Sequence, residues 1–304
     1  MRVNGGEQME LATLQNYITI ADLGNITAAA KLLHISQPAL SRQLKDLETE
    51  MGTSLMERTN RGITLTDKGE LLLNRARELV TLAEKTKQDV KTQNMIGGDL
   101  YIGAGETQGM RIVAMAVRQL QLKYPDVRVH LYSGNAEDLT SKMQSGFLDF
   151  SILTLPANHD NNHFIKLPHQ DIWGVIVRQD DPLADLNVIK PQDLHNCKLI
   201  ISSQHQVHDQ FEAWLGAPLE KEQVVGTYNL IFNAALLVEQ NFGTLVGFNN
   251  LIASTADNHL IFRPLAYFHA AQMNLVWKRG RELSPIAAAF LTEINQLIVT
   301  AKQP

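Results

Sequence analysis

The 304-residue sequence is short of cysteine, of long hydrophobic runs and of positive charge, and each shortage excludes a class of protein. Cys197 is the only cysteine, which excludes a disulfide framework, a cysteine-based metal site and a two-thiol redox switch within one chain. No apolar run approaches the ~20 residues that a membrane span needs. The first ten residues, MRVNGGEQME, lack the hydrophobic core of a signal peptide. We therefore expect a cytoplasmic protein without a membrane partner.

The net charge of −5 does not indicate a nucleic-acid-binding protein by itself. Residues 1–95 carry 12 Lys and Arg against 12 Asp and Glu, whereas residues 96–304 carry 15 against 20. The acidity belongs to the C-terminal part, and the N-terminal part is neutral. If the N-terminal part binds DNA, a local basic face has to make the contact.

The first 66 residues have the pattern of three short helices followed by a hairpin. Apolar residues recur at helical spacing over 10–24, and Thr27 is placed to cap a second helix. Ser36 is placed to cap a third helix, which has Pro38 in its first turn. Two short extended pieces then flank the turn sequence TNRG. This order is typical of a winged helix-turn-helix.

The third predicted helix offers polar and basic groups on the side opposite its apolar stripe. In a helix-turn-helix, the second helix of the motif presents such groups to base edges in the major groove. Glutamine can pair with adenine, and Arg42 suits bidentate contact with guanine. A plain solvated helix face is the competing interpretation. The residues predicted to contact DNA are Thr27, Gln37, Pro38, Ser41, Arg42, Lys45 and, at the hairpin tip, Arg61.

Downstream of the hairpin, the pattern changes twice. Thr66 is placed to cap a long amphipathic helix over 67–93, whose apolar stripe favours pairing with a second copy of the chain. From Asp99 onward, strands alternate with helices in the order βαβαβ, and a further such unit follows over 173–248. The end of the chain is expected to return to the first α/β unit.

The segment Thr27–Thr66 carries the most specific pattern of the chain. SQPALSRQLKDLE, preceded by AAAKLLHI and followed by MGTSLMERTNRGITLTDKGE, resembles the signature of the LysR-type transcriptional regulators. Tyr17 and Met56 stand where that family commonly has Phe. The resemblance implies DNA-contacting roles for Gln37, Pro38, Ser41, Arg42 and Arg61. It also implies a dimer, and two dimers forming a tetramer.

The resemblance further implies an effector cleft between two lobes. The turn GAGETQG at 103–109 invites a dinucleotide-fold interpretation, but its GxGxxxG spacing departs from the usual fingerprint. Open α/β sheets bind small ligands at the carboxyl ends of their strands. A carboxylate at position 106 favours an effector with a hydroxyl or amine over a dianion, unless Glu106 lies on the surface and the serines only cap a helix. The residues predicted to line the cleft are Glu106, Thr107, Ser133, Thr154, Ser202, Ser203 and Phe248.

The predicted architecture is α/β overall, with a mainly α N-terminal domain. The expected parts are a winged helix-turn-helix at 9–66, a linker helix at 67–95 and an effector-binding domain at 96–304. That domain is expected to hold two Rossmann-like lobes, similar to periplasmic binding proteins, at about 96–168 plus 269–304 and at about 169–268. We expect a regulator that reads an inverted repeat in promoter DNA, with the effector changing DNA bending and recruitment of RNA polymerase, and no cofactor.

Two other functions compete with this one. A solute-binding protein of the transporter type predicts a secretion signal and no recognition helix, and the sequence shows the reverse. A dinucleotide-dependent enzyme predicts nicotinamide or flavin binding. The His/Asp clusters at 159–163 and 205–209 are expected to be solvated loop or helix-start groups and not metal ligands, so we expect no enzyme. Because the family pattern begins near Met9, translation is expected to start there.

Overall fold

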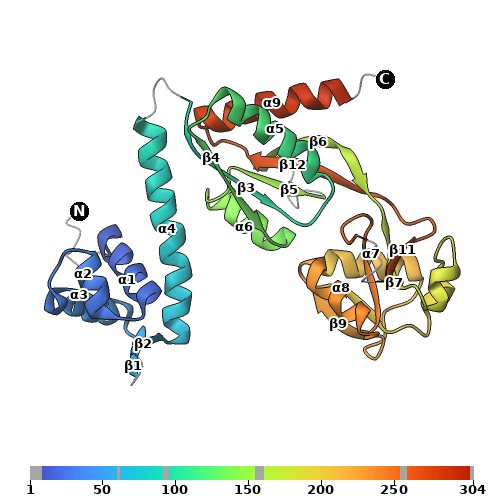
Figure 1. Ribbon diagram of the computed structural model, residues 1–304, viewed down its shortest axis with the longest axis horizontal. Helices are drawn as coiled ribbons and strands as arrows, with labels where there is room; N and C mark the ends of the chain where they lie inside the picture. Colours follow the sequence, from blue (N-terminus) through green and yellow to red (C-terminus); the bar gives the residue numbers. More distant parts are fainter. Residues whose placement is uncertain (1–8, 60–61, 92–95, 155–160, 254–258, 302–304) are drawn as a thin grey trace. The chain divides into compact units, whose positions relative to one another are not determined.

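The computed structural model describes residues 9–59, 62–91, 96–154, 161–253 and 259–301. The chain forms two compact units, residues 1–93 and 94–304, each with hydrophobic core of its own (Figure 1). Residues 1–8, Arg61 and the His159–Asp160 part of the first histidine cluster lie outside the described residues.

The first unit is the predicted three-helix domain with a hairpin and a long helix. Gly24 ends its first helix in the left-handed conformation (φ 58°), which glycine adopts without steric cost. Ser36 caps the third helix, because its Oγ accepts a hydrogen bond from the Ala39 N–H at 3.3 Å. The elements are α1 (Leu11–Leu23), α2 (Ile26–Leu32), α3 (Gln37–Met51), β1 (Met56–Thr59), β2 (Gly62–Leu65) and α4 (Asp67–Lys91).

The cap predicted for the second helix is wrong. Asn25, not Thr27, is the N-cap of α2, and its Oδ1 accepts from the Ala28 N–H at 3.0 Å. The helix begins earlier because Ile26 is buried in the domain core and takes the first helical position. Thr27 is therefore the second residue of the helix and is exposed.

A close contact between α1, α4 and the start of the hairpin holds this unit together. The Tyr17 hydroxyl donates to the Gly69 carbonyl oxygen at 2.9 Å, and Tyr17 is fully buried. A Cβ on Gly69 would lie 2.0 Å from the Leu55 carbonyl oxygen, so no larger residue fits. Burial, with a smaller effect of the Glu48 carboxylate, raises the pKa of Tyr17 to about 12.

The second unit begins with a five-stranded sheet in the order β4-β3-β5-β12-β6. The first three strands in sequence are parallel, which confirms the predicted βαβαβ arrangement, and β12 returns antiparallel between β5 and β6. The strands are β3 (Gly98–Ala104), β4 (Val127–Ser133), β5 (Phe150–Leu153), β6 (Asn162–Asp171) and β12 (Ala271–Lys278); the helices are α5 (Met110–Lys123), α6 (Ala136–Gln144) and α9 (Pro285–Ala301).

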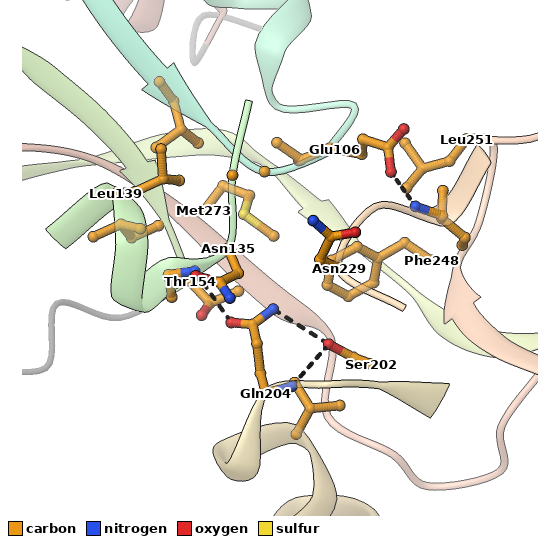
Figure 2. A pocket seen from close by; sticks show the side chains of 18 of the residues that line it. Glu106, Asn135, Leu139, Thr154, Ser202, Gln204, Asn229, Phe248, Leu251 and Met273 are labelled. Atoms are coloured by element: carbon orange, nitrogen blue, oxygen red, sulfur yellow. Dashed lines mark hydrogen bonds between the residues drawn. The ribbon is translucent and has the colours of Figure 1, made fainter. Parts of the chain in front are cut away.

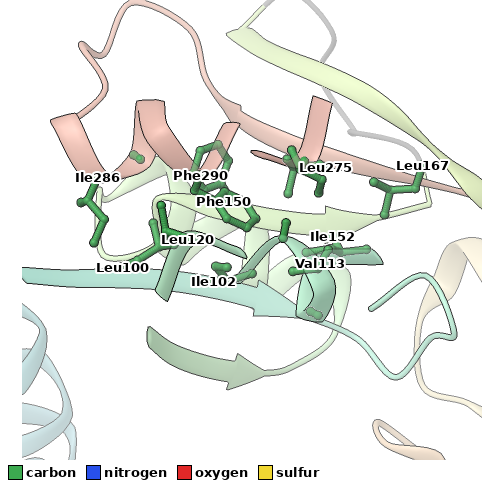
Figure 3. Packing of buried hydrophobic residues seen from close by; sticks show 14 of the residues in the cluster. Leu100, Ile102, Val113, Leu120, Phe150, Ile152, Leu167, Leu275, Ile286 and Phe290 are labelled. Carbon is green, nitrogen blue, oxygen red and sulfur yellow. The ribbon is translucent and has the colours of Figure 1, made fainter. Parts of the chain in front are cut away.

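Helices cover both faces of this sheet. Val113 and Leu120 of α5 and Phe290 of α9 pack on one face against Phe150 and its neighbours (Figure 3). Leu139 and Met143 of α6 pack on the other face. The central strand β5 is buried along its whole length because helices cover both faces of the sheet. Because β3, β4 and β5 are parallel, their carboxyl ends lie at one edge of the lobe.

The second sheet has the order β11-β7-β10-β8-β9, with β8, β9 and β10 parallel and β7 and β11 antiparallel to their neighbours. Phe211 of α7 packs on one face and Ala234 of α8 on the other. The elements are β7 (Trp173–Arg178), η2 (Pro182–Asp185), η3 (Pro191–Leu194), β8 (Leu199–Ser202), α7 (His205–Leu215), β9 (Val224–Tyr228), α8 (Ile231–Glu239), β10 (Thr244–Phe248) and β11 (Leu260–Pro264).

The chain passes between the two sheets twice. It leaves the first sheet after β6 and enters the second at β7, with only Ile172 between them. It returns between β11 and β12, over residues 265–270. The crossovers thus connect β6 to β7 and β11 to β12.

Candidate functional site

The exposed face of α3 is the first candidate site. Leu40 and Leu47 are buried in the domain core. Pro38, Arg42 and Lys45 are exposed, and the two remaining predicted residues of this helix, Gln37 and Ser41, are partly exposed.

Some polar side chains on this face form hydrogen bonds within the protein, and others do not. Gln43, which was not predicted to contact DNA, accepts a hydrogen bond from the Asn16 amide at 2.8 Å. The side chains of Gln37, Arg42 and Lys45 have no hydrogen bond or ion pair to the described part of the chain. The face therefore carries a guanidinium, an ammonium and an amide that are free to contact another molecule.

The second candidate site is a cleft between the lobes of the second unit (Figure 2). Its empty space is about 710 Å³ with open solvent included. Five predicted residues line it: Glu106, Thr107, Thr154, Ser202 and Phe248. The first three belong to segments of the first sheet, and the last two belong to β8 and β10 of the second sheet.

Two predicted residues do not line this cleft. Ser133 ends β4 and lies in a neighbouring hollow with Tyr132. Ser203 is exposed, and its backbone N–H donates to the Tyr228 carbonyl at 2.7 Å. Neither Ser202 nor Ser203 is the N-cap of α7, because that position is held by Gln204 without a side-chain cap.

Several lining residues were not predicted. Asn135 and Asn229 each follow a strand of a parallel set, β4 and β9, so the rule about carboxyl ends could have identified them. Gln204 follows β8 in the same way, and its side chain donates to Ser202 Oγ at 3.4 Å. Trp173 and Met273 lie on antiparallel strands beside the crossovers, and no local sequence signal marks them.

The turn after β3 makes hydrogen bonds across the cleft. The Glu106 carboxylate accepts from the Ile231 N–H, which lies at the start of α8, where Leu230 gives no side-chain cap. The Gln108 side-chain amide donates to the Asn250 carbonyl oxygen. This turn, residues 105–109, therefore contacts both lobes. Burial, and to a lesser extent the Glu106 charge, raises the pKa of Tyr228, whose hydroxyl donates to the Val246 carbonyl at 2.7 Å.

The same turn is anchored at the first crossover. Asp171 is fully buried at the end of β6. Its carboxylate accepts from the Thr107 hydroxyl and from the Gln108 N–H, the latter at 3.2 Å. The His169 ring nitrogen lies 3.1 Å from the same carboxylate. The position of the turn thus depends on the strand by which the chain leaves the first lobe.

Other reactive groups are separate from these two sites. Among the described residues, no three His, Cys, Asp or Glu side chains gather where they could hold a metal ion, and no helix is long and apolar enough to cross a membrane. The Cys197 thiol lies 3.4 Å from the Asp193 carbonyl, and burial raises its pKa. His163 lies on β6 and not in a loop as predicted, while His205 and His208 lie on α7.

Comparison with known proteins adds two family matches. The model of bacterial regulatory helix-turn-helix proteins of the lysR family matches residues 11–70, and the LysR substrate binding domain matches residues 93–298. A relative in Synechocystis sp., named "Probable RuBisCO transcriptional regulator", is 31% identical over 287 residues, or 90% of this chain and 82% of that protein. The regulator CysL of Bacillus subtilis is 26% identical over 288 residues, or 90% of each chain.

Solved structures show the same fold. The crystal structure of CbnR, a LysR family transcriptional regulator, matches with a TM-score of 0.69 at 18% identity, over 95% of this chain and 99% of that one. Full-length CbnR in complex with its target DNA matches with a TM-score of 0.67 at 19% identity, over the same shares of the two chains.

Proposed function

The chain belongs to the LysR family of transcriptional regulators, and from this premise we propose that it reads promoter DNA with α3 under the control of a small molecule bound in the cleft. Such a protein acts in the cytoplasm, where the DNA is. Its relatives are named as transcriptional regulators, and we propose no catalytic activity. Titration with nicotinamide and flavin dinucleotides should therefore show no binding.

The free side chains on α3 are the observation that carries this proposal. A recognition helix needs donors and acceptors that the protein does not use itself. Arg42 suits bidentate hydrogen bonding to guanine, and Gln37 suits adenine. Lys45, one turn further along, suits a phosphate. Thr27, on the exposed side of α2, is proposed to contact a DNA phosphate, and Arg61, which lies outside the described residues, is proposed to contact a phosphate or the minor groove.

A second copy of the chain supplies the other half of the DNA site. Leu71 and Leu79 of α4 are 54% and 41% exposed and lie two helical turns apart, so pairing with the same helix of another chain would bury them. A pair of recognition helices about 34 Å apart reads an inverted repeat. We propose a dimer built on α4 and a tetramer of two dimers.

Ligand binding in the cleft is proposed to control how the protein binds DNA. A ligand that contacts both lobes favours one arrangement of them, and an equilibrium shifts only by the difference in affinity for the two arrangements. Through contacts between effector domains, this would change the spacing of the DNA-binding heads, the DNA bend and the recruitment of RNA polymerase. The control half of the proposal fails if ligand binding leaves footprint, bend angle and transcription unchanged.

Footprinting on the DNA immediately upstream of the gene tests the DNA half. Wild-type protein should protect an inverted repeat, and Arg42→Ala should lose that protection. The matched control is Arg118→Ala, which removes the same charge from an exposed position of α5 and should leave the footprint unchanged. Should that region stay unprotected, selection from random DNA sites replaces it, and failure to enrich any site would refute the proposal.

A further inference from the structure

We propose that the effector of the cleft carries a protonated amine, and that Glu106 is the residue that selects it. The inference rests on the proposed function, because it takes the cleft as the effector site. It concerns the chemical class of the ligand and is carried by the charges that line the cleft and by the bond from Glu106 to α8.

Glu106 is the one carboxylate among the described residues that line the cleft, and no Lys, Arg or His is among them. Hydrogen-bonding capacity comes instead from the neutral side chains of Asn135, Gln204 and Asn229 and from hydroxyl groups. A carboxylate effector would thus enter a partly enclosed cleft without a cationic side chain to pair with. A buried charge without a partner is costly, and two like charges in one site each disfavour the other.

Helix N-termini are the other groups that bind anions, because their first N–H groups are free and the helix dipole is positive there. At α8 the Glu106 carboxylate already accepts from the Ile231 N–H. At this helix the protein's own carboxylate thus takes the place that an effector's carboxylate would occupy. An anionic effector that binds at α8 would have to displace Glu106 and leave both negative groups in the same cleft.

A cation would bind in this cleft more favourably than an anion. One carboxylate oxygen of Glu106 is bonded to Ile231, and the other has no hydrogen bond to the described part of the chain. The rings of Trp173 and Phe248 also line the cleft, with their centroids 4.2 Å apart. An ammonium is attracted by aromatic faces as well as by a carboxylate. The lining of the cleft therefore offers a cation both a carboxylate and aromatic rings.

The opposite part of the cleft suits an uncharged group. Figure 2 shows Glu106 near Leu251, whereas Gln204 and Ser202 lie together away from them. Leu139 and Met273 supply apolar surface to the lining. The effector that fits has an amine at one end, an apolar body and a neutral hydrogen-bonding group at the other end.

Thermal unfolding of the full-length protein with matched probes tests this class. One set is tyramine, 4-(2-hydroxyethyl)phenol and 4-hydroxyphenylacetate; the other is 4-aminobutanol, butanediol and 4-hydroxybutyrate. At about 10 mM, an amine that binds with a Kd of about 1 mM should raise the Tm by about 3 °C. The alcohols should have a smaller effect, and the carboxylates should have none.

Glu106→Gln provides the decisive comparison. Its side-chain carbonyl can still accept from Ile231, so the contact between the lobes is kept while the charge is lost. The rise with amines should disappear and a rise with carboxylates should become measurable. Glu222→Gln changes the net charge equally at an exposed position outside the cleft lining and should behave as wild type.

Three results would overturn the charge assignment: no amine raises the wild-type Tm, carboxylates raise it at least as much as amines, or the rise with amines persists in Glu106→Gln. A carboxylate that stabilises the wild-type protein would leave the cleft as an effector site and refute only its selectivity. The footprint of Arg42→Ala is independent of these titrations, so failure of the proposed function would be recognised separately.

Discussion

The two candidate sites differ in how far apart their residues lie in the sequence. The α3 residues proposed to contact DNA fall within one stretch, residues 37–45, whose orientation depends on one cap and one apolar stripe. The cleft collects residues from 105 to 273, which meet only when two sheets have formed and the chain has crossed between them twice. The first site therefore depends on a single helix, and the second depends on how the chain connects the two sheets.

They also differ in what their polar groups do in the absence of a ligand. On α3, Arg42 and Lys45 are exposed and without partners in the described part of the chain. In the cleft, Thr107 and Ser202 are buried, and Glu106 and Gln204 are hydrogen-bonded to the protein itself. The exposed side chains of α3 therefore need no rearrangement to contact another molecule. In the cleft, a ligand that pairs with the second carboxylate oxygen of Glu106 leaves the hydrogen bond to Ile231 in place, whereas a ligand that binds the N-terminus of α8 has to break that bond.

The largest expected effect is a loss of stability in the first unit that leaves the second unit unchanged. Gly69→Ala places a Cβ 2.0 Å from the Leu55 carbonyl oxygen, and backbone on both sides limits relaxation. We expect a loss of about 3 kcal/mol in the free energy of unfolding of the first unit, with hydrogen exchange in the second unit unchanged. Gly97→Ala is the control, since its Cβ would come no closer than 3.7 Å to a neighbour. Wild-type exchange throughout the first unit of Gly69→Ala would refute this packing argument.

A smaller effect is expected on DNA binding when Arg42 is replaced, with ligand binding in the cleft unchanged. Arg42→Ala should weaken binding to the selected DNA site by about 1–3 kcal/mol, the usual value of a bidentate base contact. Arg42→Lys should restore part of the affinity through charge but little of the preference for that site. Both variants should bind probes in the cleft as the wild type does. Fluorescence anisotropy with specific and unrelated DNA would measure the DNA binding, and equal losses on both DNAs would contradict base recognition.

The smallest expected effect is on two hydrogen-bonded tyrosines, one in each unit. Tyr17→Phe removes the bond to Gly69 and should cost about 1 kcal/mol of stability in the first unit. Tyr228→Phe removes the bond to Val246 and should cost a similar amount in the second unit. Hydrogen exchange would assign each loss to its unit. Loss of stability in the other unit would contradict the separation.

Tyr17 also adds a dependence on pH. Its folded pKa of about 12 lies above the usual value near 10, so the folded state holds the proton more tightly. The contribution is present in full below pH 10 and is lost as the pH rises from 10 towards 12. Urea unfolding of the first unit between pH 9 and 11 should show this decline in the wild type. In Tyr17→Phe the corresponding part of the slope should be absent.

The contrast between the sites explains what the sequence alone could predict. The cap at Ser36 and the extent of the first helix, predicted over 10–24, were predicted because both depend on a few adjacent residues. The cap at Asn25 was missed because two residues near that position can cap, and the burial of Ile26 decides between them.

Errors in the second unit have a different cause. Strand β6, with the sequence NHFIKLPHQD, includes His163 of a cluster that was expected to lie in a loop or at a helix start. A proline within a sheet is normally confined to an edge strand or a bulge. Strand β6 is an edge strand, and Pro168 falls in the irregular part of its pairing with β12. The rule about strand ends found Glu106 and Thr154, but it cannot find lining residues on antiparallel strands such as Trp173 and Met273.

The most direct test of the account is whether Arg42 contacts a guanine. In the selected DNA site, each guanine is replaced in turn by deazaguanine, which lacks the N7 acceptor, and the affinities of wild type and Arg42→Ala are measured. If Arg42 contacts a guanine, we expect one position in each half-site at which the replacement weakens wild-type binding. Binding of Arg42→Ala should be unaffected at that position, because the contact is already absent. Equal losses for both proteins at every guanine would show that Arg42 contacts no guanine through N7 and would contradict the assignment of α3 as the helix that reads the sequence.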